Sequence, residues 1–399
     1  MSALPTDTVL TPASIRAAVA PVLAELSATS REREGTRDYP HALVRRLADA
    51  RVTLIAVSRE DGGAGGDLRD LVDLVVDIAR ADSSVAQSLR SSFLTAWTVV
   101  SDPAGPQRER TLQRLRSGHL FAGTANERGG AAGGVATTLR PGPDGVRVVD
   151  GEKYYSTGSQ YATWFGGTAL DEHGRLVRFS VPVDRPGVEV VDDFDAVGQR
   201  LTASGTTRLH AVPVADDEWS VAADTAPRNP WQGSLAQLYL AAIEAGIAAA
   251  ALDDAVRFSR EIARPIKHST ADAAVDDPYV REVVGEIAAR ANAARAVVLL
   301  AAEVLGAVPA ADDEEVRERG AEASITVAQA QYVAIESALR AAELLFDVGG
   351  GSATDREHAL DRHWRNARTV ANHNPRAWKA AVTGGWLLVG EEPPTTGLF

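Results

Sequence analysis

The sequence of 399 residues contains no cysteine. The chain therefore has no disulfide, no thiolate ligand for zinc or an iron–sulfur cluster, and no cysteine nucleophile. It has only three lysines, Lys153, Lys267 and Lys379, and none follows a glycine, which excludes a phosphate-binding Gly-Lys-Ser/Thr loop. The G-x-G-x-x-G pattern of dinucleotide-binding folds is also missing, so no nicotinamide cofactor is expected.

Basic charge, targeting signals and metal motifs are sparse as well. The chain has 41 Lys and Arg against 54 Asp and Glu, and this net charge of −13 disfavours nucleic acid as a partner. The N-terminus lacks a basic segment followed by an apolar core, so we expect a cytoplasmic protein. The most apolar window, 235–252, is interrupted by Gln237 and Glu244, which predicts a buried core helix and no membrane contact. The eight histidines form no H-E-x-x-H motif, so we expect no bound metal.

Hydrophobic periodicity divides the chain into three parts. In residues 1–120 apolar residues recur at three- and four-residue steps, which predicts an N-terminal helical domain with Thr11 as N-cap and Pro12 at the first helical position. Residues 121–226 contain short β-rich runs between Pro, Gly and Asp turns, typical of an antiparallel sheet or small barrel. Long Ala- and Leu-rich patterns in residues 227–399 predict a C-terminal four-helix bundle. The expected fold class is α+β, mostly α.

Two segments carry candidate chemistry. Arg362, Arg365 and Arg368 recur every three residues on one predicted helical face, and this helix ends before Pro375, which leaves His373 in a loop. The arginine stripe is consistent with an anion site, and equally with a salt-bridged subunit contact beside a surface histidine. The segment 151–158 is rich in hydroxyls and aromatics and predicts a β-hairpin segment, for which an ordinary structural strand is the alternative.

Further motifs narrow the interpretation when they are taken with the domain order. They are Arg362-His-Trp-Arg-Asn-Ala-Arg-Thr369 followed by His373-Asn-Pro375, Asp193-Phe194 with Gly198-Gln-Arg200 and Thr202-Ala-Ser-Gly-Thr206, and Ala263-Arg-Pro265 followed by Asp276-Asp-Pro-Tyr279. Over nearly its whole length the chain resembles the acyl-CoA dehydrogenase fold. More narrowly, it is similar to the group D flavin-dependent monooxygenases built on that fold, the dibenzothiophene monooxygenase group.

The resemblance implies a flavin between the β domain and the bundle. Thr157 matches the hydroxyl residue that faces flavin N5, His373 matches the active-site histidine beside flavin C4a, and Arg264 matches a residue that reaches the flavin phosphate of a neighbouring subunit. Ser92 stands where sulfur-oxidising relatives carry a second histidine, and with Ala96 it is assigned to the substrate pocket. The residues assigned to the cofactor are Asn126, Tyr155, Thr157, Phe194, Ser204, Arg264, Gly350, Gly351 and Arg368.

The activity implied by the resemblance is that of a two-component monooxygenase. A separate NAD(P)H:flavin reductase would supply reduced flavin, FADH2 or FMNH2, and O2 would convert it to a C4a-(hydro)peroxyflavin that oxygenates a small apolar or heteroaromatic substrate at carbon, nitrogen or sulfur. Thr157 would accept the N5–H bond in a pocket closed by Tyr155 and Phe194, and His373, with a pKa near the working pH, would act as acid or base. A homotetramer is expected.

Two other functions remain open from the sequence. An acyl-CoA dehydrogenase needs a carboxylate to remove a proton next to a thioester, and residues 370–375 contain none. Glu244 is the only carboxylate in the predicted helix over 233–252, where its context fits packing. A non-catalytic relative of the fold is the second alternative, and failure to bind flavin would identify it.

Overall fold

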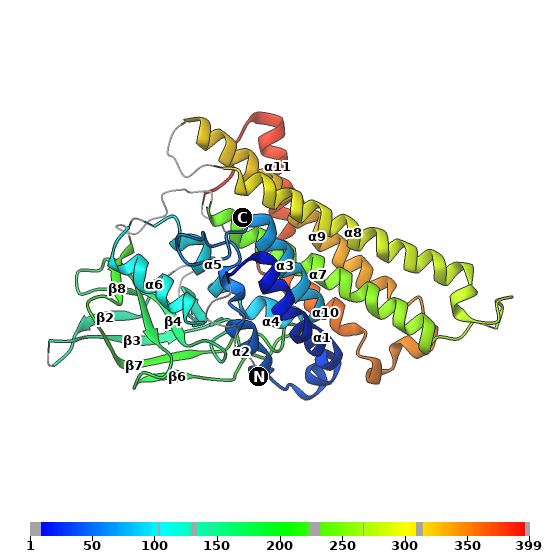
Figure 1. The fold of residues 1–399 in the computed structure, drawn as a ribbon, viewed down its shortest axis with the longest axis horizontal. Coiled ribbons are helices and arrows are strands. Elements are labelled where there is room, and N and C mark those ends of the chain that lie inside the picture. Colours follow the sequence, from blue (N-terminus) through cyan, green and yellow to red (C-terminus); the bar gives the residue numbers. More distant parts are fainter. Residues whose placement is uncertain are drawn as a thin grey trace.

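The computed structural model describes residues 9–102, 104–128, 134–143, 145–222, 232–265, 267–308 and 314–395. Helices come first along the chain, strands follow, and long helices return (Figure 1). This order confirms the expected fold class. The domain boundary expected between residues 226 and 227 lies outside the described residues.

The N-terminal helices begin with the predicted cap. The Thr11 hydroxyl accepts a hydrogen bond from the Ser14 amide at 3.1 Å, and Pro12 occupies the first helical position, where its missing N–H costs nothing. The bounds of these helices are α1 Pro12–Thr36, α2 His41–Asp49, α3 Leu68–Ala81, α4 Ser83–Ser88, α5 Arg90–Val99 and α6 Pro106–Arg116.

The middle of the chain forms one eight-stranded sheet. Most neighbouring strands are antiparallel, as expected, but β1 and β2 both pair with β4 in parallel, so the sheet is mixed. Its buried face is apolar, with Phe165, Val177 and Val212 among the residues of the core. The strands are β1 Phe121–Thr124, β2 Thr138–Pro141, β3 Arg147–Lys153, β4 Trp164–Leu170, β5 Leu176–Pro182, β6 Val188–Val190, β7 Thr207–Val214 and β8 Trp219–Val221.

The C-terminal helices are α7 Gln232–Glu261, α8 Pro278–Gly306, α9 Glu314–Leu344, α10 Asp361–Ala371 and α11 Arg376–Val389. The helices α7, α8 and α9 pack on one another, while α10 and α11 pack along α9. One described helix, Gly233–Glu261, is long and apolar enough to cross a membrane, but most of its apolar window is buried inside the molecule. This confirms the predicted core helix.

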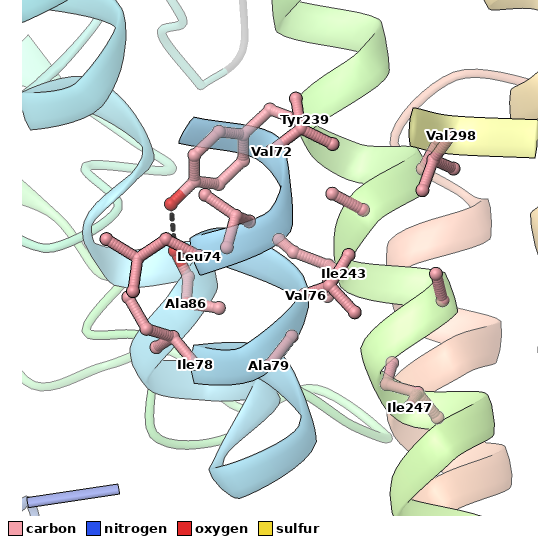
Figure 2. Close-up of a cluster of buried hydrophobic side chains, with 14 of the residues drawn as sticks. Val72, Leu74, Val76, Ile78, Ala79, Ala86, Tyr239, Ile243, Ile247 and Val298 are labelled. Carbon is pink, nitrogen blue, oxygen red and sulfur yellow. Dashed lines mark hydrogen bonds between the residues drawn. The ribbon is translucent and has the colours of Figure 1, made fainter. Parts of the chain in front are cut away.

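The N-terminal helices are fastened to the bundle through α3 and α4. Figure 2 shows Val76 and Ala79 of α3 packed toward Ile243 and Ile247 of α7. In the same region the Tyr239 hydroxyl donates to the Ala86 carbonyl at 2.7 Å. Removing these side chains from water stabilises the contact by about 25 cal/mol for each Å² of apolar surface.

The β domain is fastened to α10 by the loop that contains Gly198. A Cβ atom at Gly198 would lie 2.1 Å from the Arg365 carbonyl oxygen, so only glycine lets the two backbones approach this closely. The Gln199 amide donates to Asn366 Oδ1 at 2.6 Å, and Gln199 Nε2 donates to Ser83 Oγ at 2.9 Å. These contacts fix the position of the following residues relative to the bundle.

Candidate functional site

A chain of three hydroxyls lies where the sequence predicts flavin contacts. The Thr202 hydroxyl donates to the Gln199 carbonyl at 2.8 Å, so it can only accept at its 2.7 Å contact with Ser204 Oγ. Ser204 therefore spends its hydrogen on Thr202, and at the 2.8 Å contact between Thr157 Oγ1 and Ser204 Oγ, Thr157 is the donor. Thr157 thus keeps its lone pairs as acceptors toward any ligand.

The loop that carries Thr157 does not continue strand β3, which ends at Lys153. Tyr155 has a φ of 57° and Gly158 a φ of 84°, and a Cβ atom at Gly158 would lie 2.3 Å from the Ser88 carbonyl oxygen. The Ser156 and Gly158 amides donate to the carbonyls of Gly205 and Thr202 at 3.1 and 2.9 Å. These acceptors lie in residues 202–205, the hydroxyl segment, which carries Thr202 and Ser204. The expectation of a hairpin segment, and its alternative of an ordinary strand, are therefore wrong for Tyr154–Gly158, which forms a tight loop.

Aromatic and amide groups border the hydroxyls. The Tyr155 side chain is 54% exposed and meets the buried Phe194 edge to face, with ring centroids 6.4 Å apart. Asn126 is exposed, and its carbonyl accepts the Tyr154 amide at 3.0 Å, which places it beside the same loop. The structure thus brings together five of the sequence-predicted residues, Asn126, Tyr155, Thr157, Phe194 and Ser204.

A buried ion pair joins the end of strand β3 to the segment that carries Asn126. Lys153 Nζ donates to Glu127 Oε1 at 2.5 Å, and the Thr137 hydroxyl donates to the same oxygen at 2.6 Å. Burial alone would raise the pKa of Glu127, but the bonds from Lys153 and Thr137 outweigh it and lower the pKa to about 2. Glu127 therefore stays ionised and anchors the neighbouring Asn126.

His373 lies in the predicted turn between α10 and α11. Asn374 Oδ1 accepts from Gln237 Nε2 at 3.4 Å, and Gln237 Oε1 accepts from Lys379 Nζ at 3.1 Å. Because Asn374 presents its oxygen, the 3.0 Å contact with His373 Nδ1 makes that nitrogen the donor. The neutral imidazole then carries its hydrogen on Nδ1 and offers the lone pair of Nε2.

The protonation of His373 differs from the expectation. The residue is exposed, yet loss of solvation around the imidazole and the positive charge of Arg90 together lower its pKa to about 4. The sequence had suggested a pKa near the working pH. With this pKa the imidazole is neutral at pH 7, and its Nε2 lone pair is available to accept a hydrogen bond.

The substrate-pocket residues predicted on α5 have other partners. The Ser92 hydroxyl accepts the Phe121 amide at 2.8 Å and donates to the Phe121 carbonyl at 3.1 Å, so it joins α5 to β1. Ala96 is buried in an apolar cluster that includes Val99 and Leu112. Both side chains belong to the core, and the structure does not direct either of them toward His373.

The α5 residue whose charge reaches His373 is Arg90, which the sequence analysis missed. Arg90 is the first residue of α5, and its guanidinium donates to the Ala236 carbonyl of α7 at 3.3 Å. Arg90 comes two residues after Ser88, and the Ser88 carbonyl oxygen lies against Gly158. Residues 88–90 therefore lie between the loop over 154–158 and the turn that carries His373.

The arginine stripe of α10 is mostly occupied within the chain. Arg362 pairs with Asp254 at 2.6 Å, and Arg365 pairs with Glu34 at 2.6 Å and Asp361 at 2.8 Å. These are internal ion pairs, so the anion-binding interpretation is wrong for Arg362 and Arg365, and the alternative of a subunit contact is not needed for them. Arg368 remains exposed.

Three other predicted cofactor residues lie elsewhere in the bundle. Arg264 is exposed in the connection between α7 and α8, at the end of the bundle away from the sheet (Figure 1). Gly350 and Gly351 lie in the short 3-10 helix η4, Gly350–Thr354, and a Cβ atom on either would meet nothing within 4 Å. Their backbone is open to approach from outside the chain. A single chain does not bring Arg264 to Thr157.

Glu244 is buried on α7, and neither of its carboxylate oxygens has a hydrogen-bond partner in the described part of the chain. Burial raises its pKa well above the ordinary range of a carboxyl group, although the charge of Arg368 opposes the shift. Its burial among the helices agrees with the packing role expected from the sequence.

Comparisons with known proteins add to this geometry. Residues 12–119 match the acyl-CoA dehydrogenase N-terminal domain, and residues 238–376 match the acyl-CoA dehydrogenase C-terminal domain. The dibenzothiophene monooxygenase of Rhodococcus qingshengii is 30% identical over 352 residues, which cover 85% of this chain and 84% of the relative.

Solved structures agree over nearly the full length. FMN-bound TdsC from Paenibacillus sp. A11-2 superposes with a TM-score of 0.87 at 26% identity, covering 97% of this chain and 100% of the other. Methanesulfinate monooxygenase MsuC from Pseudomonas fluorescens gives a TM-score of 0.85 at 26% identity, covering 97% of this chain and 99% of the other.

Proposed function

The chain belongs to the acyl-CoA dehydrogenase family, and from this premise we propose how its residues carry out flavin-dependent oxygenation. It is a flavin-dependent monooxygenase related to the dibenzothiophene monooxygenases, and it uses reduced flavin and O2. The observation that carries the residue assignments is the hydroxyl chain, which leaves Thr157 as an acceptor.

The residues around Thr157 fit a flavin ring. An isoalloxazine is planar, partly aromatic and edged with N–H donors and carbonyl acceptors. The loop offers an exposed tyrosine ring, an exposed amide at Asn126 and a hydroxyl acceptor at Thr157. We assign Asn126, Tyr155, Thr157, Phe194 and Ser204 to hold the ring, and FMN as its form, because the similar TdsC was solved with FMN. Bound reduced flavin supplies the electrons that activate O2.

Thr157 and the two aromatic residues protect the reaction from water. The Thr157 acceptor would take a hydrogen bond from a ring N–H and so hold that proton in place. Tyr155, backed by the buried Phe194, would cover the same position and exclude solvent. His373, neutral and presenting Nε2, would accept a proton from the substrate or orient its reacting group.

Several parts of the assembly are inferred. Reduced flavin would come from a separate NAD(P)H:flavin reductase, because the sequence lacks a dinucleotide-binding fingerprint. The protein would work in the cytoplasm. Arg264, Gly350, Gly351 and Arg368 would contact the flavin of a neighbouring subunit, since the connection between α7 and α8, which carries Arg264, lies at the end of the bundle away from the sheet (Figure 1).

The proposed substrate is a small molecule with an apolar or heteroaromatic body. The similar enzymes are named for dibenzothiophene and methanesulfinate, so sulfur compounds are the first to test, with carbon and nitrogen oxygenation as further outcomes. In this proposal Ser92 joins α5 to β1, and Ala96 packs in the apolar cluster beside it.

A substitution at Thr157 tests the assignment. Thr157→Val removes the acceptor at nearly constant volume, so more of the consumed O2 should appear as hydrogen peroxide. The loss of one hydrogen bond, about 0.5–1.5 kcal/mol, predicts a roughly two- to tenfold fall in the product-to-peroxide ratio. Thr157→Ser keeps the hydroxyl and is the matched control. An unchanged ratio in Thr157→Val would show that the hydroxyl does not serve the flavin.

A further inference from the structure

Three basic side chains from different elements meet at one end of α7. Arg90 comes from α5, His373 from the α10–α11 turn and Lys379 from α11. The Arg90 guanidinium reaches the Ala236 carbonyl at 3.3 Å, while its Nε is buried and has no hydrogen-bond partner in the described part of the chain. Lys379 is only 1% exposed and donates to Gln237 Oε1 at 3.1 Å.

The charges of these groups act on one another. Arg90 and Lys379 both lower the pKa of His373, and burial lowers the pKa of Lys379 to about 8 and that of Arg90 to about 10. Removing the positive charge of Arg90 from water is costly unless negative charge compensates it. Within the described residues, the charged groups that shift the pKa of Arg90 include no Asp or Glu.

Other buried cations of this chain are matched differently. Arg33 pairs with Asp82 at 2.6 Å and Lys153 pairs with Glu127 at 2.5 Å, in each case with both side chains less than a tenth exposed. The protein thus normally supplies a carboxylate to a cation that it buries. Arg90 departs from this pattern, and it lies beside the proposed active site.

We propose that Arg90 and Lys379, together with the amides of Gln237 and Asn374, form a subsite that binds an anionic group of the substrate beside His373. The group would be a carboxylate, sulfinate or phenolate, which accepts hydrogen bonds from the planar guanidinium and the ammonium. This inference rests on the proposed function and narrows its substrate to a small organic anion.

The subsite lies next to the flavin-assigned loop. Gly158 touches the Ser88 carbonyl, and Arg90 is two residues farther along the chain. An anion held by Arg90 would therefore place the rest of the substrate between the loop and His373. Its negative charge would also return His373 toward its ordinary pKa, so that the imidazole could hold a proton during turnover.

Calorimetric titration of the full-length protein without flavin tests the subsite with benzoate and its neutral isostere benzamide. Benzoate should bind at least tenfold more tightly than benzamide. Arg90→Gln and Lys379→Gln should each weaken benzoate about tenfold or more, because each removes a charge-assisted hydrogen bond, and should leave benzamide unchanged. Arg69→Gln, which removes an exposed arginine paired with Glu303, is the matched control and should bind benzoate like the wild type.

A second readout does not depend on any variant. In protein labelled with 13C-histidine, the His373 resonance should titrate at higher pH when benzoate is saturating. Equal binding of benzoate and benzamide, or a His373 titration that benzoate does not move, would overturn the proposal. So would a loss of FMN affinity in Arg90→Gln without a loss of riboflavin affinity, because the cluster would then serve the flavin phosphate. Inorganic phosphate displacing benzoate with equal affinity would reduce the site to a general anion site and also overturn it.

Failure of the proposed function gives a different result. If reduced FMN and O2 yield no oxygenated product from any substrate while benzoate still binds as predicted, the oxygenase function fails and the anion subsite stands. If neutral substrates are oxygenated and the protein binds benzoate no more tightly than benzamide, the function stands and the subsite fails.

Discussion

Thr157 and His373 enter the site as acceptors for the same physical reason. Each donates its single hydrogen to a residue of the protein, Thr157 to Ser204 and His373 to Asn374, so each keeps lone pairs that can accept a hydrogen bond from a ligand. The inward partners thus set the chemistry that the two side chains offer. The acceptor role of Thr157 depends on Ser204, 47 residues away, whereas His373 donates to the next residue, Asn374, and its lowered pKa depends in part on the distant Arg90.

His373 gives a prediction at this scale. His373→Ala should still consume O2 in the presence of reduced flavin, yet it should form product about a hundred- to ten-thousandfold more slowly, the usual contribution of a positioned acid or base. His373→Asn, which keeps a polar group in the turn, is the control for folding. Product formation at the wild-type rate in His373→Ala would remove this residue from the mechanism.

The pH dependence of the wild type follows from the same group. A base with a pKa lowered to about 4 is neutral from pH 6 to 8, so product formation with a neutral substrate should be flat over that range and fall below about pH 5. The linked stability has the same sign, because the folded chain binds fewer protons there than the unfolded chain. Folding is therefore weakened as the pH drops from about 6.5 toward 4.

The sequence predicts one side of the site better than the other. Thr157, Tyr155 and Ser204 stand in motifs that mark the family, and the structure places them in contact. Arg90 is a single basic residue between Leu89 and Ser91, in no motif, so only the packing of α5 against α7 shows its proximity to His373. The lowered pKa of His373 likewise arises from burial of its imidazole and from the charge of Arg90, far earlier in the chain, and a local pattern encodes neither.

At the scale of elements, the Gly198 loop controls how the β domain meets α10. Gly198→Ala would place a Cβ atom about 2.1 Å from the Arg365 carbonyl oxygen, so the loop must move and carry the hydroxyl segment with it. Strain of this kind typically costs about 1–3 kcal/mol. We expect a lower denaturation midpoint and weaker flavin binding, measured by urea unfolding and fluorescence titration.

Gly285→Ala is the matched control for this substitution. Gly285 lies inside α8, and a Cβ atom there would meet nothing within 4 Å, so alanine should keep or raise stability. If Gly198→Ala behaved like Gly285→Ala in both measurements, the loop would not be the part that positions the site.

The limits of pattern reading are visible at the same scale. The helical periods and the Thr11 cap predict the helices well, because burial of one face imposes the 3.6-residue repeat. The composition of the segment 151–158 predicts a hairpin segment, but only its first three residues belong to a strand. Tyr155 adopts a positive φ held by bonds to residues near 202–205, a tertiary constraint that overrides local preference.

The whole molecule presents an apolar surface on its last helix. Trp378 is 55% exposed and Leu387 71% exposed on α11, with Leu388 and Val389 exposed beside it. Exposed apolar residues gathered on one element are typical of a contact surface, and oligomers of identical chains close symmetrically. We propose that α11 contributes to the contacts of a homotetramer in which neighbours complete the flavin sites.

Light scattering at micromolar concentration measures this assembly. The expected mass is four times the 42.1 kDa of one chain, and Leu388→Asp should lower it by placing a charge on the apolar surface. Glu318→Asp, a conservative change at an exposed position of α9, is the control. A wild-type monomer that binds flavin normally would contradict the shared-site arrangement.

The central claim, that this chain transfers one atom of O2 to a substrate by using reduced flavin supplied from outside, is tested most directly by isotope incorporation. The purified protein is given photoreduced FMN and 18O2 together with one test substrate, and the product masses are measured by mass spectrometry. The test substrates are dibenzothiophene, indole, methanesulfinate and benzoate. We predict a product that carries a single 18O atom, formed with reduced FMN and not with NADH alone. Oxidation of NADH by the protein unaided, or a desaturated product formed without O2 from an acyl-CoA thioester, would contradict the account.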